Sequence, residues 1–254
     1  MVEYTEFCYP NKIDFFGTTL FNVCHFTEHD LQNYKSYNKY AEGNFEVNNS
    51  ELNASLSNDL NHYDESHHVD IYDSYAHEFN VFQNIYPPIH RKTMLIAISN
   101  FCEKQLEIMC IELNKLLPES IIDDKWPGNN AISSFRRFLI NNAGFNFKKL
   151  DKYWQYFQVI KSIRNVFCHS EGEIDLNKTN VSKMIRAFCQ RYQYIRVHNN
   201  HIILEEIFID EIIAVLILFF KMLAEEVSDF IRRYEVVNGR FEIDLPPGVS
   251  RTPI

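Results

Sequence analysis

One short segment, Arg164-Asn165-x-x-x-His169, brings together three side chains that could act on a phosphodiester. The imidazole is the side chain whose ordinary pKa lies nearest neutrality, so a histidine can take up and release a proton at physiological pH. Arginine carries a permanent charge on a planar fork that fits phosphate oxygens. Cleavage of RNA without a metal can use these groups, because the strand's own 2′-hydroxyl is the nucleophile. We expect His169 to act as general base or acid, Arg164 to stabilise the pentavalent phosphate, and Asn165 to orient the imidazole or hold the phosphate.

The spacing of these residues on a helix separates them into two groups. Asn165 and His169 are four positions apart and share one face. Arg164 is five positions from His169, roughly 140° away around the helix axis. One helix therefore poses the pair poorly, whereas two such helix ends facing each other would bring two arginines and two histidines together. The alternative for each residue is structural: Arg164 and His169 as cations at a helix C-terminus, and Asn165 as a buried polar tie.

The motif falls at the end of a predicted helix over 150–169, which stops near Gly172. A second predicted helix over 92–117 carries Glu103 and Glu107 one turn apart. These carboxylates could be catalytic or could anchor Arg164 across a bundle, and the sequence favours the salt bridge. A third helix, over 206–234, is apolar on most sides, as is typical of a central bundle element. The buried stripe of the motif helix consists of Tyr153, Phe157, Ile160, Ile163 and Phe167.

Over roughly residues 85–235 the chain resembles the HEPN superfamily, whose mark is an arginine, a following polar residue and a histidine four to six positions after the arginine at a helix end. The resemblance implies a helical bundle, a composite site in a homodimer and endoribonuclease activity, with a role as a toxin or antiviral effector and an antitoxin or regulatory protein as a further partner. It equally allows a non-catalytic dimerising module that binds RNA, a nucleotide or a protein. An unrelated helical interaction protein, with its acidic part as the partner surface, is the third hypothesis.

The charge distribution supports contact with RNA near the motif. The chain carries a net charge of −9, but residues 136–196 carry +8 and the remainder −17. A local basic region can bind phosphates on an acidic protein, because salt screens charges beyond roughly 10 Å. We expect five side chains in this region to guide the RNA backbone: Lys148, Lys149, Lys152, Lys161 and Arg186. Ser170 is a further candidate for a phosphate contact.

The expected fold is mainly all-α, because only seven glycines and eight prolines are available for tight turns. We predict an N-terminal extension over 1–85, a HEPN-like helical domain over 86–235 and a C-terminal tail over 236–254. Within the extension, residues 4–26 form short strands or an arm, and the Asn- and Ser-rich stretch 44–61 forms a loop. Pro87-Pro88 stop or kink a helix, Trp126–Asn130 form a turn, and a short hairpin lies near 194–204.

Other function classes lack support in the sequence. The N-terminus has no secretory signal, and the apolar run 212–220 is too short for a membrane span, so we expect a cytoplasmic protein with no membrane partner. The six cysteines are expected to be mostly buried. Cys24-His25-x3-His29 and His62-x4-His67-His68 are only fragments of zinc patterns. No dinucleotide, P-loop, nucleophile-elbow or zincin motif is present, and we expect neither metal nor cofactor.

Overall fold

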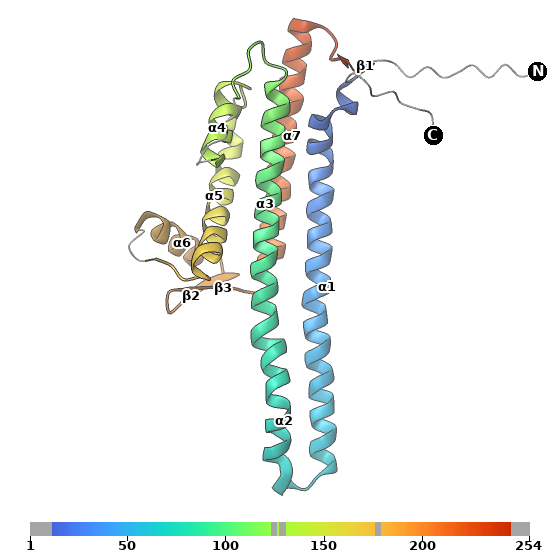
Figure 1. The fold of residues 1–254 in the computed structure, drawn as a ribbon, viewed down its shortest axis with the longest axis vertical. Helices are drawn as coiled ribbons and strands as arrows, with labels where there is room; N and C mark the ends of the chain where they lie inside the picture. Colours follow the sequence, from blue (N-terminus) through green and yellow to red (C-terminus); the bar gives the residue numbers. More distant parts are fainter. Residues whose placement is uncertain (1–11, 123–125, 127–130, 176–178, 245–254) are drawn as a thin grey trace, which may run out of the picture. The chain divides into compact units, whose positions relative to one another are not determined.

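The computed structural model describes residues 12–122, 126, 131–175 and 179–244 (Figure 1). Within these residues the chain is mainly α-helical, which confirms the predicted class. The α-helices are α1 (Thr19–His62), α2 (His68–Asn80), α3 (Tyr86–Asn114), α4 (Ala131–Asn141), α5 (Phe147–Ser170), α6 (Thr179–Arg191) and α7 (Phe208–Asn238). The strands are β1 (Lys12–Ile13), β2 (Ile195–His198), β3 (His201–Leu204) and β4 (Ile243–Asp244), and short turns of other helix types are η1 (Phe15–Gly17), η2 (Glu65–His67) and η3 (Val81–Ile85).

The chain divides into two compact units. We call His29–Lys104 with Asp151–Phe219 the motif unit, because it contains Arg164, Asn165 and His169. Met1–Glu28, Gln105–Leu150 and Phe220–Ile254 make up the terminal unit. Both units draw residues from the predicted extension and from the predicted helical domain.

In the motif unit, the part of α1 that follows His29 lies beside α2 and α3 as a helical hairpin (Figure 1). Buried and half-buried polar contacts join the two limbs. Arg91 donates to both carboxylate oxygens of Glu42, at 2.7 and 2.8 Å. His90 Nε2 donates to Asn38 Oδ1 at 3.0 Å, and Asn38 in turn donates to Asp210 of α7 at 3.1 Å. These contacts tie both hairpin limbs to the rest of the unit.

The predicted loop over 44–61 was wrong, because these residues form the second half of α1. The stretch is rich in Asn and Ser, but its few apolar residues follow a helical spacing. Phe45, Leu52, Leu56 and Leu60 recur at seven- and four-residue intervals, and each is partly buried. The polar residues are accommodated without breaking the helix, because four asparagine and serine side chains bond back to the carbonyl four residues earlier. The N-terminal region is thus more regular than predicted.

The helix over the two prolines is continuous but irregular. η3 is a π-helical turn over Val81–Ile85, and Pro87-Pro88 lie in the first turn of α3 directly after it. Proline supplies no backbone N–H, so the preceding carbonyls lose two α-helical donors at this point. The prolines therefore do not stop the helix, which was one of the two predicted outcomes, because the chain passes from π to α geometry and continues into α3.

The predicted motif helix corresponds to α5. Of its stripe, Phe157, Ile160 and Ile163 are fully buried and Phe167 is 7% exposed. Phe157 stacks on Phe219 of α7 at 5.9 Å between ring centroids. Most of the apolar run 212–220 of α7 is buried, as expected of a core helix. No described helix has the length and apolarity that crossing a membrane requires.

The predicted hairpin is confirmed as β2 and β3. The strands pair antiparallel, from Ile195 opposite Leu204 to His198 opposite His201. Asn199 and Asn200 form the connection with φ of +47° and +64°, the left-handed geometry of a two-residue hairpin turn.

In the terminal unit, β1 pairs antiparallel with β4, with Lys12 opposite Asp244. The predicted arm over 4–26 therefore contains a short strand, followed by η1 and the start of α1; its residues 4–11 lie outside the described part. α4 ends before Gly144, whose φ of +69° is the left-handed geometry of a helix C-cap. Of the predicted turn at 126–130 only Trp126 is described, and it packs on Phe135. The predicted tail is described only as far as β4. α7 ends at Asn238, shortly before this strand.

Candidate functional site

The end of α5 is fixed by two residues with left-handed backbone. Glu171 has φ of +49° and Gly172 has φ of +93°. A Cβ at Gly172 would lie 2.8 Å from Phe167 Cε1, so the turn needs glycine both for its φ and for this close approach. The sharp turn ends the helix at Ser170 and leaves His169 in its last turn.

A hollow of about 240 Å³, which we call the α5-end hollow, opens beside this last turn. Asn165, His169 and Ser170 line it from α5, and Ser182 lines it from α6. His169 and Ser170 are exposed, and Asn165 is half-buried. Within the described part of the chain neither Asn165 nor His169 makes a side-chain hydrogen bond. Both side chains are thus available to a molecule that enters the hollow.

The rim of the α5-end hollow is built mainly from backbone hydrogen bonds to the hairpin. Ile174 N–H donates to Asn200 O at 2.8 Å, and Ile202 N–H donates to Gly172 O at 2.9 Å. On the α6 side, Ser182 Oγ donates to Asp175 O at 2.6 Å. Hydrogen bonds therefore hold the segment that follows α5 against the hairpin and the start of α6.

Arg164 lies away from this hollow. Its Nη2 donates to Glu103 Oε2 of α3 at 2.8 Å, and Lys161 Nζ donates to Glu103 Oε1 at 2.6 Å. The three side chains are only 17% to 22% exposed. This is the salt bridge that the sequence favoured for Glu103. Arg164 Nε is buried and has no hydrogen-bond partner among the described residues.

The cations predicted to guide RNA are dispersed. Lys148 and Lys149 are exposed in the first turn of α5 and belong to the terminal unit. Lys152 is exposed with its Nζ 4.6 Å from the Tyr153 ring centre, about 25 Å along α5 from His169. Lys161 is bound to Glu103, and Arg186 donates to Asn200 Oδ1 at 2.8 Å.

The α5-end hollow thus assembles only part of the predicted site: Asn165, His169 and Ser170, without Arg164 or the predicted cations. The sequence did not indicate Ser182 or the two carboxylates that also line it, Glu173 and Asp175. Their positions depend on pairing with a hairpin some 25 residues further along the chain, a contact that no local pattern encodes. A carboxylate pair and a helix C-terminus both disfavour an anion. The imidazole of His169 could transfer a proton in this hollow. A phosphate bound there would need a cation that is not among the described lining residues.

The residues of the weighed zinc patterns have other neighbours. His25 stacks on Phe21 at 5.2 Å, and His68 Nε2 lies 3.0 Å from Leu60 O. Burial raises the pKa of the Cys24 thiol to about 12, which opposes the thiolate that binds metal. Across the described residues no three His, Cys, Asp or Glu side chains are grouped to hold a metal ion.

Comparison of the chain with models of known families, with curated proteins and with solved structures finds no match. The resemblance to the HEPN superfamily therefore rests on the motif and the order of helices alone.

Proposed function

We propose that the end of α5 is one half of a metal-independent RNA-cleaving site, completed by a second copy of the chain. The observation that carries the proposal is the α5-end hollow, where Asn165 and His169 lie one turn apart and, within the described part of the chain, make no side-chain hydrogen bond. An exposed histidine with an amide beside it is suited to bind a phosphodiester and move its protons.

The chemistry assigns the protons as follows. His169 takes the proton of the 2′-hydroxyl, O2′ attacks the adjacent phosphorus, and the bond from phosphorus to O5′ breaks. The departing O5′ receives a proton from a second imidazole, for which His169 of the partner subunit is the candidate. The products are a 2′,3′-cyclic phosphate and a 5′-hydroxyl.

A second copy is required because the described residues that line the hollow include no lysine or arginine. Arg164 of the same chain is held by Glu103, outside the set of residues that line the hollow. A partner helix end facing the hollow could present its own Arg164 to the developing charge, a contribution that an arginine fork makes well. The proposal therefore predicts a dimer and a dependence of cleavage on both residues.

The second candidate is a non-cleaving module that binds RNA or a protein partner through the same region. Two observations favour it: Arg164 is already neutralised by Glu103, and Glu173 and Asp175 place carboxylates in the hollow. Under this alternative Arg164 has a structural role, and His169 contributes at most to binding.

Cleavage of end-labelled single-stranded RNA in excess EDTA separates the candidates. For a ribonuclease, His169→Ala lowers the rate by about 10²- to 10⁴-fold, the usual contribution of a general acid or base. The matched control is His198→Ala, an exposed histidine of the hairpin that does not line the hollow. Equal cleavage by wild type and His169→Ala rejects the first candidate, and RNA binding without cleavage supports the second.

Subunit mixing tests the composite site. Arg164→Ala and His169→Ala should each be inactive, and their mixture should regain only part of the activity, because a mixed dimer pairs one His169 with the Arg164 of the other chain but lacks the second imidazole. Arg164→Lys keeps the charge for Glu103 but loses the planar fork, so it separates the structural role from the catalytic one. A monomer by sedimentation at micromolar concentration contradicts the composite site. The proposed role as a toxin or antiviral effector predicts growth arrest on expression, relieved by His169→Ala.

A further inference from the structure

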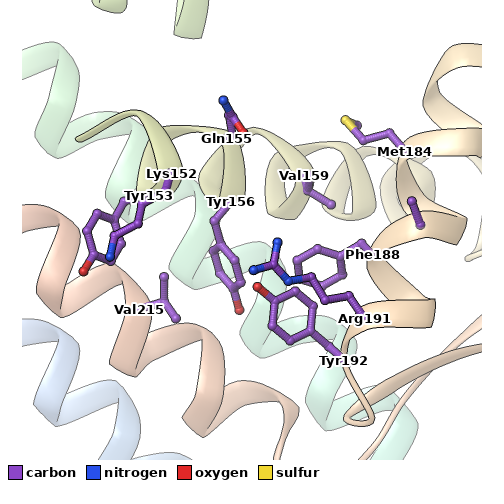
Figure 2. A pocket seen from close by; sticks show the side chains of 11 residues that line it. Lys152, Tyr153, Gln155, Tyr156, Val159, Met184, Phe188, Arg191, Tyr192 and Val215 are labelled. Atoms are coloured by element: carbon purple, nitrogen blue, oxygen red, sulfur yellow. The ribbon is translucent and has the colours of Figure 1, made fainter. Parts of the chain in front are cut away.

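A second cavity lies in the motif unit, between the first half of α5 and the end of α6 (Figure 2). Its volume is about 380 Å³, within the range of sites that hold small molecules. Among the described residues that line it there is no aspartate or glutamate. We call it the aromatic cavity, after Tyr153, Tyr156, Phe188 and Tyr192, which line it together with Lys152 and Arg191.

The aromatic side chains form a fixed wall. Tyr156 and Phe188 are both 7% exposed, with ring centres 5.3 Å apart. Tyr192 lies against both, at 5.9 Å from Tyr156 and 4.5 Å from Phe188. The hydroxyls of Tyr156 and Tyr194 are hydrogen-bonded at 3.1 Å, which holds the Tyr156 ring in place. Tyr192 itself is only half-buried, so part of its ring remains available to a planar ligand.

Within the described part of the chain, the two cations of the aromatic cavity have no carboxylate partner. Lys152 Nζ lies 4.6 Å from the Tyr153 ring centre, and the Arg191 guanidinium lies 5.5 Å from that of Tyr192. Among the described residues, neither cation makes an ion pair or a hydrogen bond through its side chain. Both are exposed, so they stand at the mouth of the cavity, where an anion can reach them from solvent.

Tyr156 and its partner Tyr194 remain neutral at physiological pH. Burial raises the pKa of Tyr156 well above its usual range and that of Tyr194 to about 12. These two phenols therefore add no negative charge to oppose an anion, and they stay hydrogen-bond donors; the negative charge of Glu211 also raises the pKa of both.

We propose that the aromatic cavity binds one nucleotide, with its base against Tyr156 and Tyr192 and its phosphate at Lys152 and Arg191. Aromatic surface beside unneutralised cations is the complement of a planar base that carries a phosphate, whether the nucleotide is free or part of an RNA strand. The cavity is distinct from the α5-end hollow, because its residues on α5 lie about 15–25 Å along the helix from His169. The inference does not depend on RNA cleavage.

The test is fluorescence anisotropy on the full-length protein with two probes: adenosine monophosphate labelled on the ribose, and a 2′-O-methylated single strand that cannot be cleaved through its 2′ position. Arg191→Gln and Lys152→Gln should each weaken binding of at least one probe by about tenfold, the effect of losing one charge-assisted contact. Arg232→Gln, an exposed arginine of α7, is the matched control and should bind as wild type. Tyr192→Leu should weaken binding about fivefold or more, whereas Tyr192→Phe keeps the ring and should change it less than twofold.

Competition identifies the source of the nucleotide. Displacement by unlabelled adenosine monophosphate, but not by ribose 5-phosphate, shows that the base is bound as well as the phosphate. If only the strand binds and Arg191→Gln weakens it, the cavity takes a residue of RNA; if only the mononucleotide binds, it takes a free nucleotide. The proposal is overturned if neither probe binds, if Arg191→Gln and Tyr192→Leu bind as wild type, or if ribose 5-phosphate competes equally well.

The outcome is separable from that of the cleavage proposal. Loss of binding in Arg191→Gln with no cleavage by wild type leaves the aromatic cavity intact and rejects the ribonuclease. Cleavage lost only in His169→Ala, with binding of both probes unchanged in Arg191→Gln, rejects the nucleotide site alone. Circular dichroism at 222 nm checks that each variant retains the helical fold.

Discussion

Glu103 holds both Lys161 and Arg164, and its replacement by glutamine perturbs the motif without changing the shape of the side chain. In the wild type, the carboxylate accepts from Lys161 at 2.6 Å and from Arg164 at 2.8 Å. In Glu103→Gln an ammonium and a guanidinium remain side by side without the carboxylate that paired with both. All three side chains are about one-fifth exposed, so water relieves this only in part.

The expected loss follows from this geometry. A hydrogen bond to a charged group contributes about 1.5–3 kcal/mol, and removing one partner of a fully buried ion pair costs about 3–5 kcal/mol. Partial exposure lowers these values, and the amide oxygen of glutamine still accepts one bond. We expect Glu103→Gln to lower the free energy of unfolding by about 2–3 kcal/mol. For a chain of this size that corresponds to a fall in Tm of roughly 4–12 °C.

Urea denaturation followed by circular dichroism at 222 nm measures the change. The matched control is Glu112→Gln on the same helix, where the carboxylate forms an ion pair with the exposed Lys115; its effect should stay within about 1 kcal/mol. Combining Glu103→Gln with Arg164→Gln should give a coupling energy of at least about 1 kcal/mol. A loss no larger than that of the control, or no coupling, would show that Glu103 does not hold Arg164 in solution.

Three further predictions concern the backbone, pH and thiol reactivity. Gly172→Ala should lower the free energy of unfolding by about 2 kcal/mol or more, since φ is +93° and the new Cβ would meet Phe167. Gly43→Ala within α1, where a Cβ would have nothing within 4 Å, should raise it by about 0.5–1 kcal/mol. Urea titrations measure both changes. Burial is the largest cause that lowers the pKa of His90 from 6.5; Arg91 also lowers it, and Glu42 opposes both. The unfolded chain therefore binds more protons than the folded chain. The free energy of unfolding should fall as pH drops below 6.5 and level off below the lowered pKa. His90→Gln, which keeps an amide donor for Asn38, should reduce that slope in urea titrations between pH 7 and 5. At pH 8, iodoacetamide should alkylate exposed Cys168 at least tenfold faster than buried Cys102 and Cys110, as measured by peptide mass spectrometry, and RNA should slow the reaction at Cys168.

Each of these has a contrary result. Equal stability of Gly172→Ala and wild type would mean that the turn after α5 is not left-handed in solution. A slope unchanged by His90→Gln would assign the acid sensitivity to another group. Alkylation of Cys168 that RNA leaves unchanged would place bound RNA away from His169.

The motif helix could be predicted from the sequence because its signal is local. Phe157, Ile160, Ile163 and Phe167 follow helical spacing over several turns, and Gly172 marks the end. The ion pair between Glu103 and Arg164 could also be anticipated, because the two predicted helices had to pack and each offered one charge to the other. Local periodicity together with charge complementarity was sufficient for this part of the fold.

Two features could not be predicted from the sequence, because their causes do not lie in local composition or in neighbouring residues. Asparagine and serine favour loops on average, yet over 44–61 four widely spaced apolar residues and a partner helix decide the structure. The acidic lining of the α5-end hollow depends on backbone bonds from Gly172 and Ile174 to the hairpin. The aromatic cavity left a faint signal, since basic and aromatic residues adjoin at Lys152-Tyr153 and Arg191-Tyr192, but only the fold brings these pairs together.

The backbone rim of the α5-end hollow has a consequence for how this site can change in evolution. Because main-chain atoms of Gly172, Ile174, Asn200 and Ile202 form the hydrogen bonds of the rim, the exposed side chain of Glu173 contributes charge without supporting the rim. A substitution at Glu173 can therefore change the electrostatic potential of the hollow while its shape persists. A lineage could move between a phosphate-repelling and a phosphate-binding form through a few surface substitutions, with the fold unchanged throughout.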